Sequence, residues 1–193
     1  KPVAMADQVK KTVEKERGLL TGEQKYFRGL FSGGTLAYET LILLQEELGG
    51  IYSNVSLDPQ YALEDVFKSR EHTVVDLGDD QFTQGRPHPM IDPTIRNQRI
   101  VAEAKDPQTA VIMLDLVLGY NAHPDPAGET LKAIKEARQA AEGRHLVFVV
   151  SVCGTDEDPQ DRREQVEKLT QNNVHVLPSN AEAALFAKAV LGS

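Results

Sequence analysis

Short apolar runs alternate with helical stretches along most of this chain, and this alternation limits the fold more than any other feature. Stretches with helical periodicity lie at 35–48, 94–105, 127–142, 160–171 and 181–191. The apolar runs are YFRGLF (26–31), HTVVDL (72–77), AVIMLDLVL (110–118), HLVFVVSV (145–152) and VHVL (174–177), with IYSNVSL (51–57) as a weaker candidate. Continuous apolar strands separated by helices predict a parallel sheet that is covered on both faces. We therefore expect a flavodoxin-like or Rossmann-like three-layer α/β domain with a mostly parallel sheet of about five strands.

Aspartate–proline pairs mark three of the expected helix starts. An aspartate side chain caps the first N–H groups of a helix, and proline suits the first helical position. A serine–asparagine pair supplies a cap for the last helix. The pairs stand at 92–93, 125–126, 158–159 and 179–180.

The composition excludes several classes of protein. The net charge is −8, and an extended nucleic-acid surface needs clustered lysine and arginine, so we expect no nucleic-acid partner. The longest apolar runs are too short to span a bilayer, and we expect no membrane partner. A single cysteine, Cys153, cannot form an intrachain disulfide. Together these features predict a cytoplasmic protein.

The first 25 residues differ from the rest of the chain. They are charged and helix-forming, with only sparse apolar residues, and the chain does not begin with methionine. We interpret residues 1–25 as a linker helix that joins an upstream segment, and residues 26–193 as the domain itself.

The turn FSGGT, after the first apolar run, raises the main functional question. Ligands of open parallel sheets bind outside the carboxyl ends of the strands. Here Ser32, Gly33, Gly34 and Thr35 can present N–H groups and hydroxyls to a phosphate or carboxylate at a helix N-terminus. The alternative is an ordinary strand-to-helix turn, because neither a Walker A loop nor a GxGxxG motif is present.

A long loop at 78–92 carries further candidates. Arg86 can bind a carboxylate or phosphate with two parallel hydrogen bonds, and prolines on both sides hold His88 extended as a candidate catalytic residue. Asp79 and Asp80 are oxygen ligands of the kind that Mg²⁺ uses, but adjacent aspartates are more typical of turns, and we assign no metal site. An ordered loop packed by its own apolar residues is the alternative.

Two more strand ends carry residues of chemical interest. Asn121 and His123 lie in the loop at 119–125, where Asn121 is a candidate for anion binding and His123 for acid–base catalysis or anion contact. Cys153 follows the next strand, and because its ionisable neighbours are acidic we expect a buried, unreactive thiol there.

Several segments together resemble the C-terminal region of the FdrA family, which is acyl-CoA synthetase-like and related to succinyl-CoA synthetase. The similar segments are GLFSGGTLAYETLILL, VVDLGDDQFTQGRPHPMIDPTIRNQRI, VIMLDLVLGYNAHPDPA and VSVCGTDEDPQDRREQVEKLTQNNVHVLPSNAEAALFA. They cover about residues 26–191, and GRPHPMIDP is the most specific of them.

The resemblance implies a flavodoxin-like CoA-ligase domain that works with other parts of an enzyme. It implies an upstream CoA-binding domain of the same chain or partner subunits, so CoA or a nucleotide phosphate would be bound through other domains and none by this domain. It also implies a small anionic substrate. The oligomeric state stays open, with a homo-oligomer among the alternatives.

In the synthetases, "power helices" point their N-termini at a phosphohistidine. The resemblance places one such helix after Ser32–Thr35 and a second one after Asn121 and His123. The phosphohistidine itself lies in a Gly-His-Ala-Gly loop, which this sequence lacks, so that role does not pass to His123.

Three functions remain at this stage. The leading one is an anion-binding C-terminal domain of an FdrA-type acyl-CoA synthetase-like enzyme, with Gly33–Thr35 and Arg86 holding the anion. FdrA-type proteins are also associated with carbamoyl transfer in allantoin breakdown, so a carbamoyltransferase subunit acting on carbamoyl phosphate or oxamate is an alternative. The third is a non-catalytic assembly domain.

Overall fold

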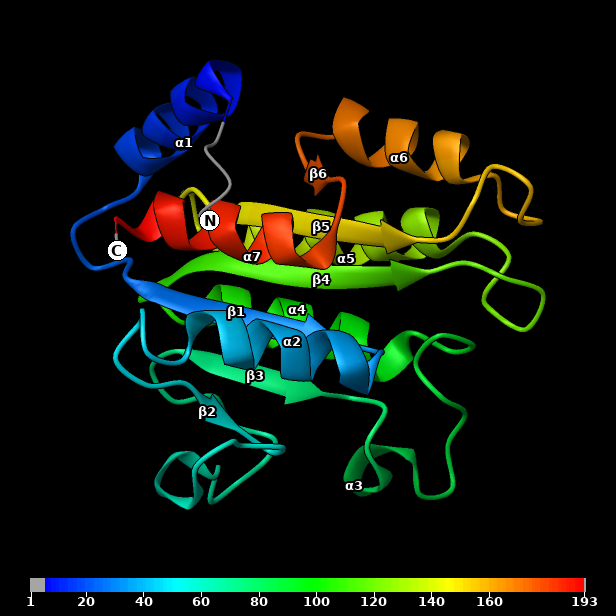
Figure 1. The fold of residues 1–193 in the computed structure, drawn as a ribbon, viewed down its shortest axis with the longest axis horizontal. Helices are drawn as coiled ribbons and strands as arrows, with labels where there is room; N and C mark the ends of the chain where they lie inside the picture. Colours follow the sequence, from blue (N-terminus) through cyan, green and yellow to red (C-terminus); the bar gives the residue numbers. More distant parts are fainter. Residues whose placement is uncertain (1–5, 193) are drawn as a thin grey trace.

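A six-stranded sheet, parallel throughout, forms the centre of the molecule, in the strand order β2-β3-β1-β4-β5-β6 (Figure 1). The structure is a computed structural model and describes residues 6–192. The strands are β1 (Tyr26–Phe31), β2 (Tyr52–Ser53), β3 (Thr73–Asp76), β4 (Thr109–Val117), β5 (Val147–Cys153) and β6 (His175–Leu177). The expected α/β fold is therefore confirmed.

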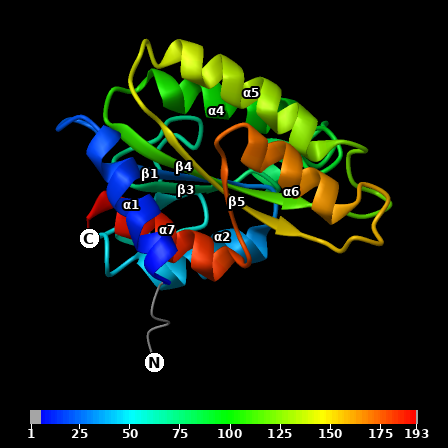
Figure 2. The same ribbon diagram turned by 90° about the horizontal axis from the view of Figure 1, so that it is seen from above.

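Helices cover both faces of this sheet, which makes three layers (Figure 2). Helices α1, α2 and α7 pack on one face, and α4, α5 and α6 pack on the other. The helices are α1 (Asp7–Leu19), α2 (Gly34–Leu44), α3 (Asp80–Thr83), α4 (Thr94–Lys105), α5 (Pro126–Ala140), α6 (Arg162–Gln171) and α7 (Asn180–Leu191), with a 3₁₀ turn η1 (Pro59–Tyr61).

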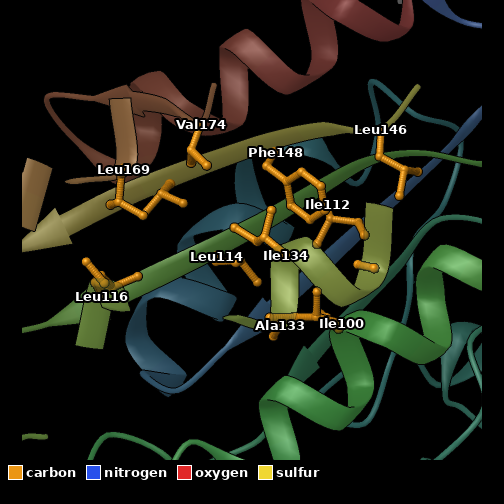
Figure 3. Close-up of a cluster of buried hydrophobic side chains, with 14 of the residues drawn as sticks. Ile100, Ile112, Leu114, Leu116, Ala133, Ile134, Leu146, Phe148, Leu169 and Val174 are labelled. Carbon is orange, nitrogen blue, oxygen red and sulfur yellow. The ribbon is translucent and has the colours of Figure 1, made fainter. Parts of the chain in front are cut away.

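Alternating residues of the central strands fill the two cores. Ile112, Leu114 and Phe148 are fully buried on the face of α4 and α5, where Ile134 and Ile100 pack against them (Figure 3). The neighbouring strand residues point to the other face, toward α2 and α7. Because both faces of β4 and β5 are buried, these strands read as unbroken apolar runs in the sequence.

The edge strand β2 had the weakest sequence signal of the expected strands, and it is the shortest strand in the structure. Only Tyr52 and Ser53 pair with β3. After them the Asn54 side chain takes over, since its amide donates to the Asp76 carbonyl at 3.0 Å and accepts from the Asp76 N–H at 2.9 Å. A side chain thus replaces the main-chain ladder, and the expected strand over 51–57 ends early.

The helix starts confirm two of the expected caps and correct the other two. Asp92 does not cap α4, because Pro93 takes the N-cap position and the helix begins at Thr94, whose N–H donates to Asp92 at 3.0 Å. Asp125 caps α5 and Ser179 caps α7 through the expected side-chain bonds. Asp158 does not cap α6; it closes a turn by accepting from the Thr155 N–H at 2.6 Å, and Asp161 caps the helix instead. The Asp158 prediction was wrong because a second aspartate stands closer to the first helical turn.

Helix α1 confirms that the lead-in is helical, and it packs against the domain. Val13 is buried in the core on the side of α7, and the Arg17 guanidinium donates to the carbonyls of Ala189 and Val190 at the end of α7. A helix held in this way is part of the folded unit, whatever precedes it. The division of the chain at residue 25 stays a prediction.

The strand order reverses between β1 and β4. After β1 the chain forms β2 and β3 on one side of it, and then crosses to β4 on the other side. In open parallel sheets this reversal leaves a crevice at the carboxyl ends of the two strands. In Figure 1 these ends are the arrowheads, where the turn into α2 also lies.

Candidate functional site

The turn between β1 and α2 is held from below by a buried carboxylate. Asp115 of β4 is fully buried, and its two oxygens accept hydrogen bonds from the Ser32 N–H at 2.8 Å, the Ser32 hydroxyl at 3.0 Å and the Gly33 N–H at 2.8 Å. The first two N–H groups of the turn therefore already donate to a carboxylate of the protein itself. This bonding fixes the position at which α2 begins.

Arg96 of α4 completes this support. The residue is 3% exposed, and its guanidinium forms an ion pair with Asp115 at 2.9 Å. The same group contacts the Asp115 carbonyl, the Ser32 hydroxyl at 3.4 Å and the Thr130 hydroxyl at 3.5 Å. Burial lowers the pKa of Arg96, and Asp115 opposes that shift. The Arg96 Nε is buried without a hydrogen-bond partner. We define Ser32, Gly33, Asp115 and Arg96 as the turn support.

Above the turn support, the start of α2 has free donors. Gly33 caps the helix without a side-chain bond, and the N–H groups of Leu36 and Ala37 bond to the Gly33 carbonyl. The N–H groups of Gly34 and Thr35 have no acceptor among the residues that the structure describes. Two unpaired donors at the positive end of an 11-residue helix dipole are suited to an anion.

A half-buried carboxylate lies next to these donors. Asp76, at the end of β3, accepts from the Gly78 N–H at 2.9 Å with Oδ1. Its Oδ2 lies 2.7 Å from the place that a Cβ on Gly34 would occupy, so a larger side chain would displace it. Burial raises the pKa of Asp76. The hydrogen bond from Gly78 opposes that shift, and the negative charges of Asp79 and Asp115 add to it.

His88 of the 78–92 loop lies beside Gly78 and Asp76 at the end of β3. Its Nε2 lies 2.5 Å from the place of a Cβ on Gly78, next to the Asp76 carboxylate. Its Nδ1 accepts from the Met90 N–H at 3.2 Å. A neutral His88 therefore carries its proton on Nε2, the nitrogen that faces the carboxyl end of β3.

Three other predicted residues have different surroundings. Arg86 is exposed and lines a shallow pocket of about 350 Å³ with Pro87 and residues of the α4 start; it makes no hydrogen bond or ion pair with residues 32–35. Asn121 is exposed in the β4–α5 loop. His123 joins two loops, since its N–H donates to the Met90 carbonyl at 2.8 Å and its Nδ1 accepts from the Asp125 N–H at 3.0 Å.

The structure thus brings together Ser32, Gly33, Gly34, Thr35 and His88. It does not place Arg86, Asn121 or His123 in contact with them. The clearest omissions of the sequence analysis are Asp115 and Arg96. One signal was available, because Asp115 is the single charged residue within the apolar run AVIMLDLVL, where an unpaired charge would be costly.

Other features of the described chain bear on the earlier expectations. Cys153 is exposed at the end of β5, so the expectation of a buried thiol was wrong. Within residues 6–192, no group of three histidine, cysteine or acidic side chains is arranged to hold a metal ion. Among the helices described, none has the length and apolar character to cross a membrane.

Comparison with known proteins places this fold and turn in a family. The model of the CoA-ligase family matches residues 30–190, which include the β1–α2 turn and all of the sheet except the start of β1. The chain belongs to the CoA-ligase family. A relative of this CoA-ligase domain is the uncharacterized protein YahF of Escherichia coli K12, which is 47% identical over 174 residues. The match covers 89% of this chain and 34% of the relative, so the domain spans about a third of that protein's length.

Proposed function

We propose that this CoA-ligase domain is the C-terminal domain of an FdrA-type acyl-CoA synthetase-like enzyme, and that it binds the phosphate or carboxylate group of a small substrate at the start of α2. The observation that carries the proposal is the pair of unpaired N–H groups at Gly34 and Thr35, placed at the strand-order reversal. Preorganised donors of this kind stabilise negative charge without having to reorient.

The turn support explains why the donors are preorganised. Because Asp115 accepts the Ser32 and Gly33 N–H groups, the chain cannot rotate those groups toward a ligand, and α2 begins at a fixed place. Only the next two N–H groups remain for an anion. His88 Nε2 supplies a further donor from the side of β3.

Other domains would complete the reaction. The sequence has no Gly-His-Ala-Gly loop, so we assign a phosphohistidine, and CoA itself, to an upstream domain or a partner subunit. The length of YahF outside the match leaves room for such domains in a protein of that kind. Carbamoyl phosphate and oxamate carry the same anionic groups, so carbamoyl transfer would use the same donors.

An assembly role is a second candidate, and the outer face of α2 favours it. Tyr38 is 52% exposed and Ile42 is 58% exposed, one helical turn apart. Apolar side chains that share an exposed face are typical of surfaces that another protein covers. In an enzyme of several domains, this face and the anion site at the start of the same helix would serve together.

The test is a titration of the protein with inorganic phosphate, carbamoyl phosphate and oxamate, followed by the amide resonances of Gly34 and Thr35. We expect saturable shifts of both resonances with at least one ligand. Gly34→Pro removes one donor at a helical position that accepts proline, after a residue that is already extended. This variant should lose binding.

Gly34→Ala is the matched control. It adds a Cβ at the same place near Asp76 and keeps the N–H, so it should retain binding. Equal loss in both variants would assign the effect to crowding of Asp76. Absence of shifts at Gly34 and Thr35 with all three ligands would contradict the anion site and leave the assembly role.

A further inference from the structure

The Asp76 carboxylate at the end of β3 uses only one of its two oxygens within the described part of the chain. Oδ1 accepts from the Gly78 N–H at 2.9 Å, and Oδ2 has no hydrogen bond or ion pair there. The main chain of Asp76 is fixed, because its N–H and its carbonyl both bond to the Asn54 side chain. A carboxylate on a fixed strand end therefore presents one free acceptor.

This free oxygen lies beside the start of α2, where two N–H groups are unpaired. Asp76 Oδ2 is 2.7 Å from the place that a Cβ on Gly34 would occupy, and Gly34 carries one of those N–H groups. On the other side, His88 Nε2 and the Ser32 carbonyl lie 2.5 Å and 2.7 Å from the place of a Cβ on Gly78. The two glycines thus keep side chains away from a space that both donors and acceptors border.

No cation of the described residues forms an ion pair with Asp76. The other carboxylate near the turn, Asp115, is paired with Arg96 at 2.9 Å. Burial raises the pKa of Asp76 against the hydrogen bond from Gly78, and the negative charges of Asp79 and Asp115 add to that shift. An anion at the start of α2 is therefore repelled by an ionised Asp76, unless the anion donates a proton of its own to Oδ2.

We propose that Asp76 makes the anion site select hydrogen phosphate over anions that carry no proton donor, of which sulfate is a close match in shape. The inference rests on the anion site proposed above and adds the chemistry of its ligand. Inorganic phosphate keeps at least one P–OH group at neutral pH. That group donates to Asp76 Oδ2, while other phosphate oxygens accept from the N–H groups of Gly34 and Thr35.

Sulfate is tetrahedral like phosphate but carries no proton at neutral pH, so its oxygens would face the carboxylate directly. It loses an O–H···O⁻ hydrogen bond, which belongs to the strong class of hydrogen bonds in proteins. It also brings two negative groups together at a half-buried place, where water screens charges less than in bulk solution. Since both effects act in the same direction, phosphate should bind at least about tenfold more tightly than sulfate.

Paired titrations of the protein with sodium phosphate and sodium sulfate, at neutral pH and equal ionic strength, test this preference. The amide resonances of Gly34 and Thr35 report binding. We expect saturable shifts with phosphate and at least about tenfold weaker binding of sulfate. Equal affinities would leave the anion site in place and overturn the selection by Asp76. Absence of shifts with both anions would overturn the anion site and, with it, this inference.

Asp76→Asn separates selection from support of the fold. The asparagine keeps an acceptor for the Gly78 N–H and places an uncharged amide donor where Oδ2 was. Sulfate should therefore bind this variant more tightly than it binds the wild type, and the preference for phosphate should fall below about threefold. An unchanged preference, or weaker binding of both anions, would contradict the proposal.

Asp79→Asn is the matched control. It removes an equal charge close to the site, since the charge of Asp79 acts on the pKa of Asp76, and asparagine can keep the cap of α3. Both anions should bind more tightly in this variant, with the preference for phosphate unchanged. A loss of preference as large as in Asp76→Asn would assign the discrimination to net charge and overturn the role of Oδ2.

Discussion

Two buried ionic networks lie at opposite ends of the sheet, and they differ in how completely they are satisfied. At the amino ends of the strands, each guanidinium nitrogen of Arg28 has an acceptor: the Glu71 carbonyl at 2.9 Å, Glu103, and Asp106 at 2.7 Å. At the carboxyl ends, the turn support leaves the Arg96 Nε without a partner and gives Arg96 Nη2 only a 3.5 Å contact.

Arg99 extends the amino-end network in the same complete manner. Its three nitrogens donate to Glu103 at 2.7 Å, the Val66 carbonyl at 2.9 Å and the Ser69 hydroxyl at 2.8 Å. This network, in which every guanidinium nitrogen has an acceptor, ties β1, α4 and the β2–β3 loop together. The carboxyl-end network borders two more unpaired donors, on Gly34 and Thr35. Unsatisfied donors distinguish a candidate binding site from structural support.

The largest loss of stability should follow when the network at the amino ends of the strands is broken. Arg28→Met leaves Glu103 and Asp106 without their shared cation, and breaking a buried ion pair in this way costs about 3–5 kcal/mol. Urea unfolding should show a matching drop in the free energy of unfolding. The control is Lys132→Met, which removes an exposed pair with Glu129 and should change stability by less than about 1 kcal/mol. Equal effects of the two variants would contradict the difference in burial.

Asp115→Asn should have the next largest effect on stability, about 3 kcal/mol, and should also weaken anion binding. The asparagine leaves the Arg96 charge buried and turns one acceptor into a donor that faces the Ser32 and Gly33 N–H groups. Urea unfolding and phosphate titration measure the two effects separately. A stable variant that still binds phosphate would show that the turn does not depend on this carboxylate.

Ser32→Ala should cost about 1 kcal/mol, since it removes one hydroxyl donor to Asp115 and keeps the N–H donor of the same residue. Thr130→Val should cost less, because its hydroxyl is only a distant partner of Arg96. Thermal unfolding of the two variants ranks them. The reverse order would mean that Arg96 relies on Thr130 more than the 3.5 Å distance indicates.

The smallest effect on stability should come from Asp76, and it depends on pH. Because burial raises the pKa of Asp76, the folded state binds its proton more tightly than the unfolded state does. The contribution of Asp76 to the free energy of unfolding is therefore complete below pH 3.8. It is lost as the pH rises through the raised pKa of the folded state.

Asp76→Asn should remove that pH dependence and raise stability at neutral pH by less than about 1 kcal/mol, since the side chain is partly exposed and water screens its charge. Urea unfolding of both proteins across the acid range measures this. A wild type and variant with parallel pH profiles would exclude Asp76 as the titrating group.

The layers of this fold can be predicted from the sequence, and the site only in part. Apolar runs such as AVIMLDLVL give strands because both faces of a central parallel strand are buried, which leaves a strong local signal. The short strand β2 has no such signal, since Asn54 finishes its pairing through a side chain.

The site depends on contacts between residues far apart in the chain. Arg86 and His88 stand two positions apart in one loop, and nothing local indicates that His88 comes close to Asp76 while Arg86 points to the start of α4. Ser32 and Asp115 meet because β1 and β4 are neighbouring strands, and Arg96 reaches the same carboxylate from α4. A charged residue inside an apolar run is the one local clue to such a pair.

The most direct test of the account compares phosphate affinity in two destabilised variants, Arg28→Met and Asp115→Asn, at a temperature where both remain folded. We predict that Arg28→Met keeps the dissociation constant of the wild type, because its network serves stability alone. Asp115→Asn should weaken binding at least about tenfold, because it releases the turn that presents Gly34 and Thr35. Equal affinities in the two variants would contradict the division into structural and binding ends of the sheet.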